Sequence, residues 1–300
     1  MKHTNLWSLI CCFIVAATVM TSCGKAVYEE YAQAEEETAT KTKKFTFTTK
    51  GDFQLVNYQS ARKAPTYLSA TDNTLTDLWV FDYVDGQLQQ YLHQTSGDAD
   101  WGQPTMNLTY NTHHIYFVAS RGAEPVVDTN EHTIIFSIPR DTYWKDYEVT
   151  VVSTSNGNRA VTLDRVATKL SVTITDRLPE DISTISVTPS VWYHGLDYTT
   201  GEAVEGKTQT TSITVPDSKK GSEDGMTIGM FSLSSTSEWK TDINIKAETT
   251  TGVQLGETTI TEAPFQRNRV TNFSGRLFSQ SGNFQISIDS DWNEPYIGTW

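Results

Sequence analysis

An alternation of apolar and polar residues with a period of two dominates this sequence beyond its N-terminal segment. Successive side chains of a β-strand point to opposite faces, so this alternation is typical of half-buried strands. The segment LTDLWVFDY places Trp79, Phe81 and Tyr83 on one face of a strand. Leu78 and Val80 take the other face. A chain with this pattern must bury the apolar faces of its strands in sheets.

The same alternation recurs in short runs that Gly, Asn, Asp and Ser residues separate. Asp85-Gly86 predicts a tight hairpin turn, because glycine tolerates a positive φ. No segment of ten or more residues has a convincing helical period. Regularly spaced strand runs favour β-sandwiches, so we predict an all-β fold. The runs cover residues 44–48, 75–83, 88–92, 114–119, 133–138, 147–152, 170–174, 185–187, 213–215, 228–233, 243–247 and 284–288.

The N-terminus has the form of a secretory signal peptide. Lys2 and His3 give a positive start, residues 6–19 are apolar, and small residues precede Cys23. The apolar stretch is shorter than the ~20 residues that span a membrane comfortably. Met-Thr-Ser-Cys resembles a bacterial lipobox, so we predict a lipoprotein signal peptide at residues 1–22 and lipidation of Cys23. The alternative is an ordinary signal peptide, or a retained anchor helix, with an incidental cysteine.

All three cysteines, Cys11, Cys12 and Cys23, lie in the leader or at its end. The body therefore has no disulfide framework and no thiolate metal site, and core burial alone must stabilise it. Residues 23–43 are rich in glutamate and poor in large apolar residues. Such a segment buries too little surface to offset its ordering entropy, so we predict a flexible acidic tether.

A polar stretch, STSNGN at residues 153–158, divides the strand runs into two sets. Its composition is typical of a linker. The chain length beyond the leader fits two domains better than one. We therefore predict an N-terminal β-sandwich at residues 44–155 and a C-terminal β-sandwich at residues 156–300.

The charge and the motifs exclude several classes of function. The net charge is −13, with 23 Lys and Arg against 36 Asp and Glu, and this sign repels phosphate backbones. His113 and His114 are neighbours on a strand and point to opposite faces, so they do not form a metal pair. The sequence holds no nucleophile elbow, no His-Glu-x-x-His and no Walker loop. We expect no enzyme activity, no metal, no cofactor and no nucleic-acid partner.

The tryptophans either fill a core or stack against sugar rings. Trp79 and Trp192 lie within strand patterns, so we predict that they fill a core. Trp101 and Trp144 lie in loop-like contexts and are the better candidates for glycan contacts.

Several phrases, taken in order, resemble the fimbrillin superfamily of Bacteroidales, which includes fimbrial shaft, tip and anchor subunits. The resemblance begins with the lipobox leader and covers residues 44–292. Its phrases are TDLWVFDYVDGQL, NTHHIYFVASRG, VTLDRVATKLSVTITD, RNRVTNFSGRLF and FQISIDSDW.

The resemblance implies two tandem transthyretin-like, Greek-key β-sandwiches and export as a lipoprotein. It also implies that polymerising members lose their first strand by proteolysis and accept a neighbour's strand in its place. The cut follows a basic residue in the loop after the first strand, and here Arg62 and Lys63 are the candidates. An ordinary exposed basic loop is the alternative. Anchor subunits keep their lipid, because their first strand is not removed.

The last strand run has a regular apolar face. Phe284, Ile286 and Ile288 alternate with polar residues, so this strand could fill a row of apolar pockets on another subunit. It could equally close the core of its own sandwich.

These observations favour a surface lipoprotein that its lipid holds in the outer membrane and that acts as a fimbrial subunit or anchor. Its partners would be other fimbrial subunits, and any host or glycan ligand stays unnamed. The rival interpretation is a surface glycan-binding lipoprotein of a polysaccharide-uptake system.

Overall fold

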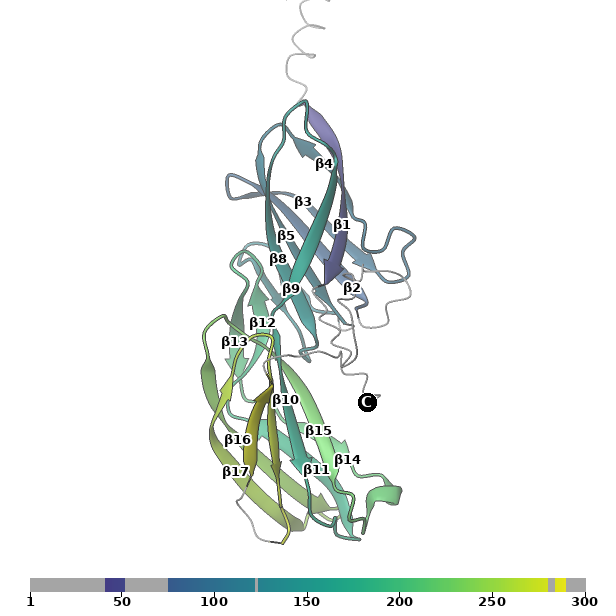
Figure 1. Ribbon diagram of the computed structural model, residues 1–300, viewed down its shortest axis with the longest axis vertical. Coiled ribbons are helices and arrows are strands. Elements are labelled where there is room, and N and C mark those ends of the chain that lie inside the picture. The colour runs from purple at the N-terminus through teal and green to yellow at the C-terminus, as the bar shows by residue number, and fades with distance from the viewer. Residues whose placement is uncertain (1–40, 52–74, 122–123, 280–283, 290–300) are drawn as a thin grey trace, which may run out of the picture. The chain divides into compact units, whose positions relative to one another are not determined.

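The computed structural model describes residues 41–51, 75–121, 124–279 and 284–289 (Figure 1). The chain divides into two compact units, Met1–Thr42 and Lys43–Trp300, and the fold below is that of the second. Its described residues form strands, turns and one short 3-10 helix, η1 (Asp217–Lys219). This confirms the predicted all-β fold. None of the described residues forms a helix that is long and apolar enough to cross a membrane.

Seven strands form the largest sheet, in the order β3-β2-β5-β8-β9-β1-β4. Its assigned pairs β2–β3, β2–β5, β5–β8 and β8–β9 are antiparallel, whereas β1 runs parallel to β9. The strands are β1 (Thr42–Gly51), β2 (Asp77–Val84), β3 (Gln87–Thr95), β4 (Thr105–Thr109), β5 (Thr112–Ser120), β8 (Thr142–Thr150) and β9 (Asn158–Arg165).

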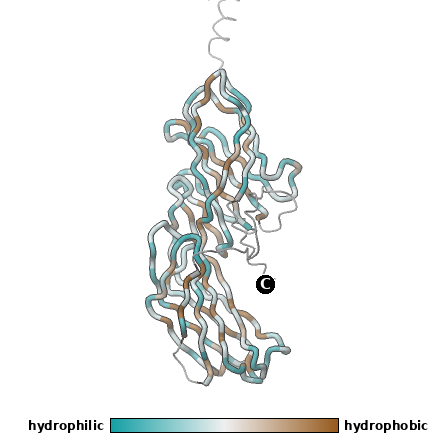
Figure 2. Tube along the Cα trace, viewed as in Figure 1, coloured by the Kyte–Doolittle hydropathy of each residue, from teal (hydrophilic) through white to brown (hydrophobic). Residues whose placement is uncertain are grey.

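This sheet curls around a single hydrophobic core. Phe45 and Phe47 of β1 are fully buried, because the alternation in Lys-Phe-Thr-Phe-Thr turns both rings to the same face. They share the core with Leu78 and Val80 of β2 and with Leu163 of β9. Strands from both halves of the sheet therefore face one another across this core. Figure 2 shows the corresponding apolar segments along the strands.

Two four-stranded sheets enclose a second core and form a β-sandwich. One has the order β15-β10-β18-β19 and the other β14-β11-β16-β17. Leu170 and Val172 of the first sheet pack in the same core as Ile185, Val187 and Ile245 of the second. The strands are β10 (Ala167–Ile174), β11 (Ile182–Pro189), β14 (Thr211–Thr214), β15 (Met226–Leu233), β16 (Trp239–Thr249), β17 (Gln254–Phe265), β18 (Val270–Gly275) and β19 (Gln285–Asp289).

A fourth sheet, in the order β13-β12-β7-β6, joins strands from both halves of the chain. It covers the second face of β2, where the Phe81 ring stacks on Tyr198 with ring centroids 3.9 Å apart. Strand β2 is therefore buried on both faces, whereas its alternation alone indicated a half-buried strand. The strands are β6 (Val126–Asp128), β7 (Thr133–Ile135), β12 (Trp192–Asp197) and β13 (Glu202–Lys207).

The polar stretch at residues 153–158 leads directly into β9. This strand pairs with β1 and with β8, so residues 158–165 belong to the seven-stranded sheet. Strand β10 begins two residues after β9 ends, at Ala167. The division into two domains stays a prediction.

Candidate functional site

Strand β1 lies between β9 and β4 and is held on both sides by backbone hydrogen bonds. The Thr46 amide donates to the Gly157 carbonyl at 2.7 Å. On the other side, the Phe47 amide donates to Pro104 at 3.0 Å and the Thr49 amide to Gly102 at 2.9 Å. The first described strand of the chain is thus an integral part of the largest sheet.

Several residues singled out in the sequence lie outside the described residues. They are Cys23, the leader at residues 1–22, most of the tether, and Arg62 and Lys63. Along the chain, residues 52–74 connect β1 to β2. Lipidation and processing therefore stay predictions.

Among the described strands, β19 lies at the edge of its sheet and pairs with β18 alone. Ile286 is 50% exposed and Ile288 is 45% exposed, although they stand opposite Phe273 and Thr271, both of which are buried. Phe284 is half-buried and packs against the core of the sandwich. The strand therefore extends its own sheet while its two isoleucines keep about half of their surface in contact with solvent.

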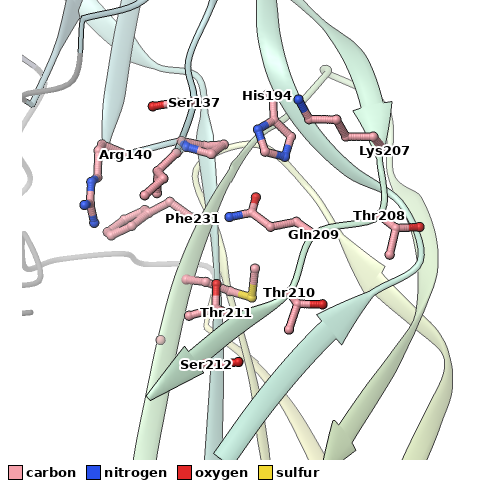
Figure 3. A pocket seen from close by; sticks show the side chains of 14 residues that line it. Ser137, Arg140, His194, Lys207, Thr208, Gln209, Thr210, Thr211, Ser212 and Phe231 are labelled. Atoms are coloured by element: carbon pink, nitrogen blue, oxygen red, sulfur yellow. The ribbon is translucent and has the colours of Figure 1, made fainter. Parts of the chain in front are cut away.

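A pocket of about 580 Å³ opens where residues 137–140, β12, β13, β14 and β15 come together (Figure 3). Figure 3 shows the side chains of His194 and Gln209 facing each other in this pocket, with the amino group of Lys207 beside the imidazole. His194 is 2% exposed. Its Nε2 and the Oε1 of Gln209 are buried and have no hydrogen-bond partner among the described residues. A buried polar atom without a partner is costly, so this arrangement is suited to a ligand.

The hydrogen bond at the other nitrogen fixes the tautomer of His194. Nδ1 lies 3.3 Å from the carbonyl oxygen of Phe136, which can only accept, so Nδ1 carries the hydrogen. Burial and the charge of Lys207 lower the pKa of His194, against the opposing effects of the backbone and Glu205. The ring is therefore neutral at pH 7, and Nε2 presents a lone pair to the pocket.

The charges around this pocket are unbalanced. Arg140 and Lys207 line it, and no carboxylate does among the described residues. Burial, and then repulsion by Arg121, lower the pKa of Arg140. In the described part of the chain, neither Arg140 nor Lys207 has an ion-pair partner. None of these pocket residues stood out in the sequence, because the elements that carry them meet only in the folded chain.

A second buried polar group is the pair Asp82 and His113, which the sequence did not reveal. Both side chains are buried, and Nδ1 of His113 lies 2.6 Å from Oδ1 of Asp82. Burial raises the pKa of Asp82, and the hydrogen bond and charge of His113 oppose that shift. His114 lies on the opposite, exposed face beside Asp146, so the two histidines diverge as predicted. Across the described ranges, no three His, Cys, Asp or Glu side chains gather as metal ligands.

The expected glycan-contacting tryptophans are in fact packed. Trp101 is 3% exposed and lies in the core of the seven-stranded sheet. Trp144 is half-buried, and its Nε1 donates to the Tyr198 carbonyl at 2.7 Å. The prediction was wrong for Trp101, because this large ring gains more from burial in the core. For the half-buried Trp144 it stays a prediction. Trp79 and Trp192 are buried as predicted.

An all-β body of this arrangement also occurs in solved proteins of Bacteroides. A protein from Bacteroides thetaiotaomicron proposed to bind polysaccharide aligns with a TM-score of 0.54 at 10% identity, over 82% of this chain and 96% of that chain. A proposed adhesin from Bacteroides ovatus aligns with a TM-score of 0.50 at 14% identity, over 75% and 84%. The fimbrial anchor Mfa2 of Porphyromonas gingivalis aligns with a TM-score of 0.49 at 10% identity, over 83% and 98%.

The first two alignments establish a shared fold. By sequence, the chain belongs to the DUF6562 family, a family of unknown function, whose profile matches residues 101–299. No curated protein matches the sequence.

Proposed function

We propose that this chain is a cell-surface lipoprotein that serves as a fimbrial subunit or anchor and assembles through β-strand contacts. The observation that carries the proposal is the position of β1. This strand contributes two fully buried phenylalanines and lies between two strands of the largest sheet.

Removal of β1 would create an acceptor groove of defined chemistry. The facing edges of β9 and β4 would lose their hydrogen-bond partner, and the sites of Phe45 and Phe47 would be empty. An unpaired edge beside an empty apolar row accepts an incoming strand with alternate apolar side chains. A cut after Arg62 would leave β1 joined to the rest of the body by non-covalent contacts alone, because β1 precedes that segment.

The anchor version of the proposal keeps β1 in place. Lipidation at Cys23 would hold the chain in the outer membrane, and residues 24–40 would act as the tether. Two domains would follow, with the division at Val166, because β9 still belongs to the sheet of β1. Whether the chain is a polymerising subunit or an anchor, the half-exposed side chains of Ile286 and Ile288 on β19 would contact the next subunit.

A surface-assembly experiment tests this proposal. The wild-type chain and the double variant Ile286→Asp, Ile288→Asp are produced in a Bacteroidales host, and sheared surface polymers are separated from the cell envelope. We expect the wild-type chain in the sheared polymer or at the polymer base in the cell envelope. The amount of the double variant in each of these two fractions should be at least tenfold lower. The matched control is Gln285→Asp, Ser287→Asp, which adds the same charge to the neighbouring exposed positions of β19.

Thermal melting of the purified variants separates assembly from folding. Because the two isoleucines are half exposed, we expect the double variant to keep a cooperative melting transition. Wild-type protein absent from every polymer and every complex with another subunit would refute the proposal. Equal loss of the control variant would refute the contact assigned to the isoleucine face.

A second candidate function, glycan binding, is favoured by the pocket around His194. It is compatible with assembly, because the pocket and β1 are built from different strands.

A further inference from the structure

The hydrogen-bonding groups of the His194 pocket favour a ligand with hydroxyl groups. Nε2 of His194 and Oε1 of Gln209 are both buried acceptors, and neither has a hydrogen-bond partner in the described part of the chain. They require donors from a ligand, and hydroxyl groups supply donors without adding charge. Thr210, Thr211 and Ser212 line the same wall. The hydroxyls of Thr210 and Ser212 pair with those of Thr188 and Ser186, so the two unpartnered acceptors carry the argument.

The charged groups of the pocket favour an anion. Arg140 and Lys207 contribute positive charge in a chain whose net charge is −13. Burial and the charge of Arg121 both disfavour the charged form of the Arg140 guanidinium, and an anion would offset both effects. The paired donors of a guanidinium suit two oxygens of a carboxylate or of a sulfate.

No simple ligand satisfies both sets of groups. An inorganic anion would be repelled by the two buried acceptors, and a neutral sugar would leave both cations without a partner. A saccharide that carries an acidic group has hydroxyl donors and an anion on one rigid ring. The remaining wall includes Ile138, Met230 and Phe231, which suit the apolar face of such a ring.

From this geometry we infer that the pocket lined by His194, Gln209, Lys207 and Arg140 binds an acidic saccharide, a uronate, sialate or sulfated sugar. Nε2 of His194 and Oε1 of Gln209 accept hydrogen bonds from ring hydroxyls. Arg140 binds the acidic group on one side of the pocket, and Lys207 supplies positive charge beside His194 (Figure 3). The volume of about 580 Å³ accommodates one to three sugar residues, since sites for small ligands commonly measure ~300–1,000 Å³. This inference does not depend on fimbrial assembly.

Calorimetric titration of the full-length chain, purified in mild detergent, tests this inference. The probes are trigalacturonate with its methyl ester, 3′-sialyllactose with its sialic acid methyl ester, and galactose 6-sulfate with galactose. Each pair keeps the sugar and changes only its acidic part. We expect at least one acidic probe to bind, its neutral counterpart to bind at least tenfold more weakly, and sodium sulfate alone not to compete at equal concentration.

Variants assign the binding to this pocket. His194→Ala and Arg140→Gln should each weaken binding of the acidic probe at least tenfold. Gln209→Leu removes the second acceptor, and we expect it to weaken binding as well. Because Gln209 is only half-buried, this variant should fold even if His194→Ala does not. Lys240→Gln is the charge-matched control, because Lys240 is exposed, pairs with Glu262 and lies outside the pocket.

The inference is overturned if no acidic probe binds better than its neutral counterpart. It is equally overturned if folded Arg140→Gln and Gln209→Leu proteins bind the acidic probe as the wild type does. A loss of binding in Lys240→Gln equal to that in Arg140→Gln would show a general charge effect and would also reject the site.

Discussion

Arg165 donates hydrogen bonds from Nε and Nη2 to both carboxylate oxygens of Asp141, at 2.8 and 3.1 Å. The pair is buried and lies where β9 ends and β8 begins. Nη1 of the same guanidinium also donates to Asn268, just before β18, at 3.3 Å. One arginine thus ties the seven-stranded sheet to the neighbouring sandwich.

Breaking this buried pair should destabilise the fold strongly. Arg165→Met leaves the Asp141 carboxylate buried without its partner, so we expect a loss of ~3–5 kcal/mol in the free energy of unfolding. Urea denaturation at pH 7 measures it. Lys145→Ala, which removes the exposed pair with Asp164, is the control and should cost less than ~1 kcal/mol. Equal effects of the two substitutions would contradict the structural role of Arg165.

Asp176 gives a prediction for acidic pH. Its carboxylate accepts hydrogen bonds from the amides of Leu277, Phe278 and Ser279, at 3.1, 2.7 and 2.9 Å. Burial acts to raise the pKa of Asp176, but the backbone hydrogen bonds outweigh it and lower the pKa below 3.8. The folded state thus binds this proton less readily than the unfolded state. The stabilisation is present above the unfolded pKa and is lost as pH falls through the folded pKa.

The variant Asp176→Asn should therefore be less stable at pH 7 by ~1.5–3 kcal/mol, the typical contribution of hydrogen bonds to a charged group. The difference from wild type should shrink as the pH falls below ~4, the usual pKa of a free aspartate. Urea denaturation between pH 7 and pH 2.5 measures it, with the exposed Asp181→Asn as control. A difference that stays constant down to pH 2.5 would argue against the charged hydrogen bonds.

Gly157 gives a prediction for the docking of β1. A Cβ atom at this position would lie 2.3 Å from the carbonyl oxygen of Lys44, so Gly157→Ala must push β1 away from β9. We expect a loss of ~1–3 kcal/mol in stability, as for other overpacked sites, with faster amide hydrogen exchange in β1. Gly97→Ala is the matched control, because the nearest neighbour of its Cβ would be 3.9 Å away. Unchanged exchange at Thr46 in Gly157→Ala would contradict the close approach.

The sequence by itself determined many of the strands and their apolar faces, although its predicted runs did not include β4, β9, β17 or β18. The alternation that predicted strands around Phe45, Trp79 and Leu170 is local, since side-chain direction depends only on position along the strand. The same reasoning separated His113 from His114. It also predicted an apolar face on the last strand, which the structure pairs with β18.

Only the tertiary structure decided which strands are neighbours. Alternation shows which face of a strand is apolar but not which element packs against that face. The sequence therefore did not predict that β1 pairs in parallel with β9, or that another sheet packs on the second face of β2. The pocket around His194 has the same origin, because Arg140, His194 and Gln209 come from separate segments. Side-chain periodicity depends only on consecutive residues. The burial, the unpaired acceptors and the excess positive charge of this pocket arise only when distant segments pack together.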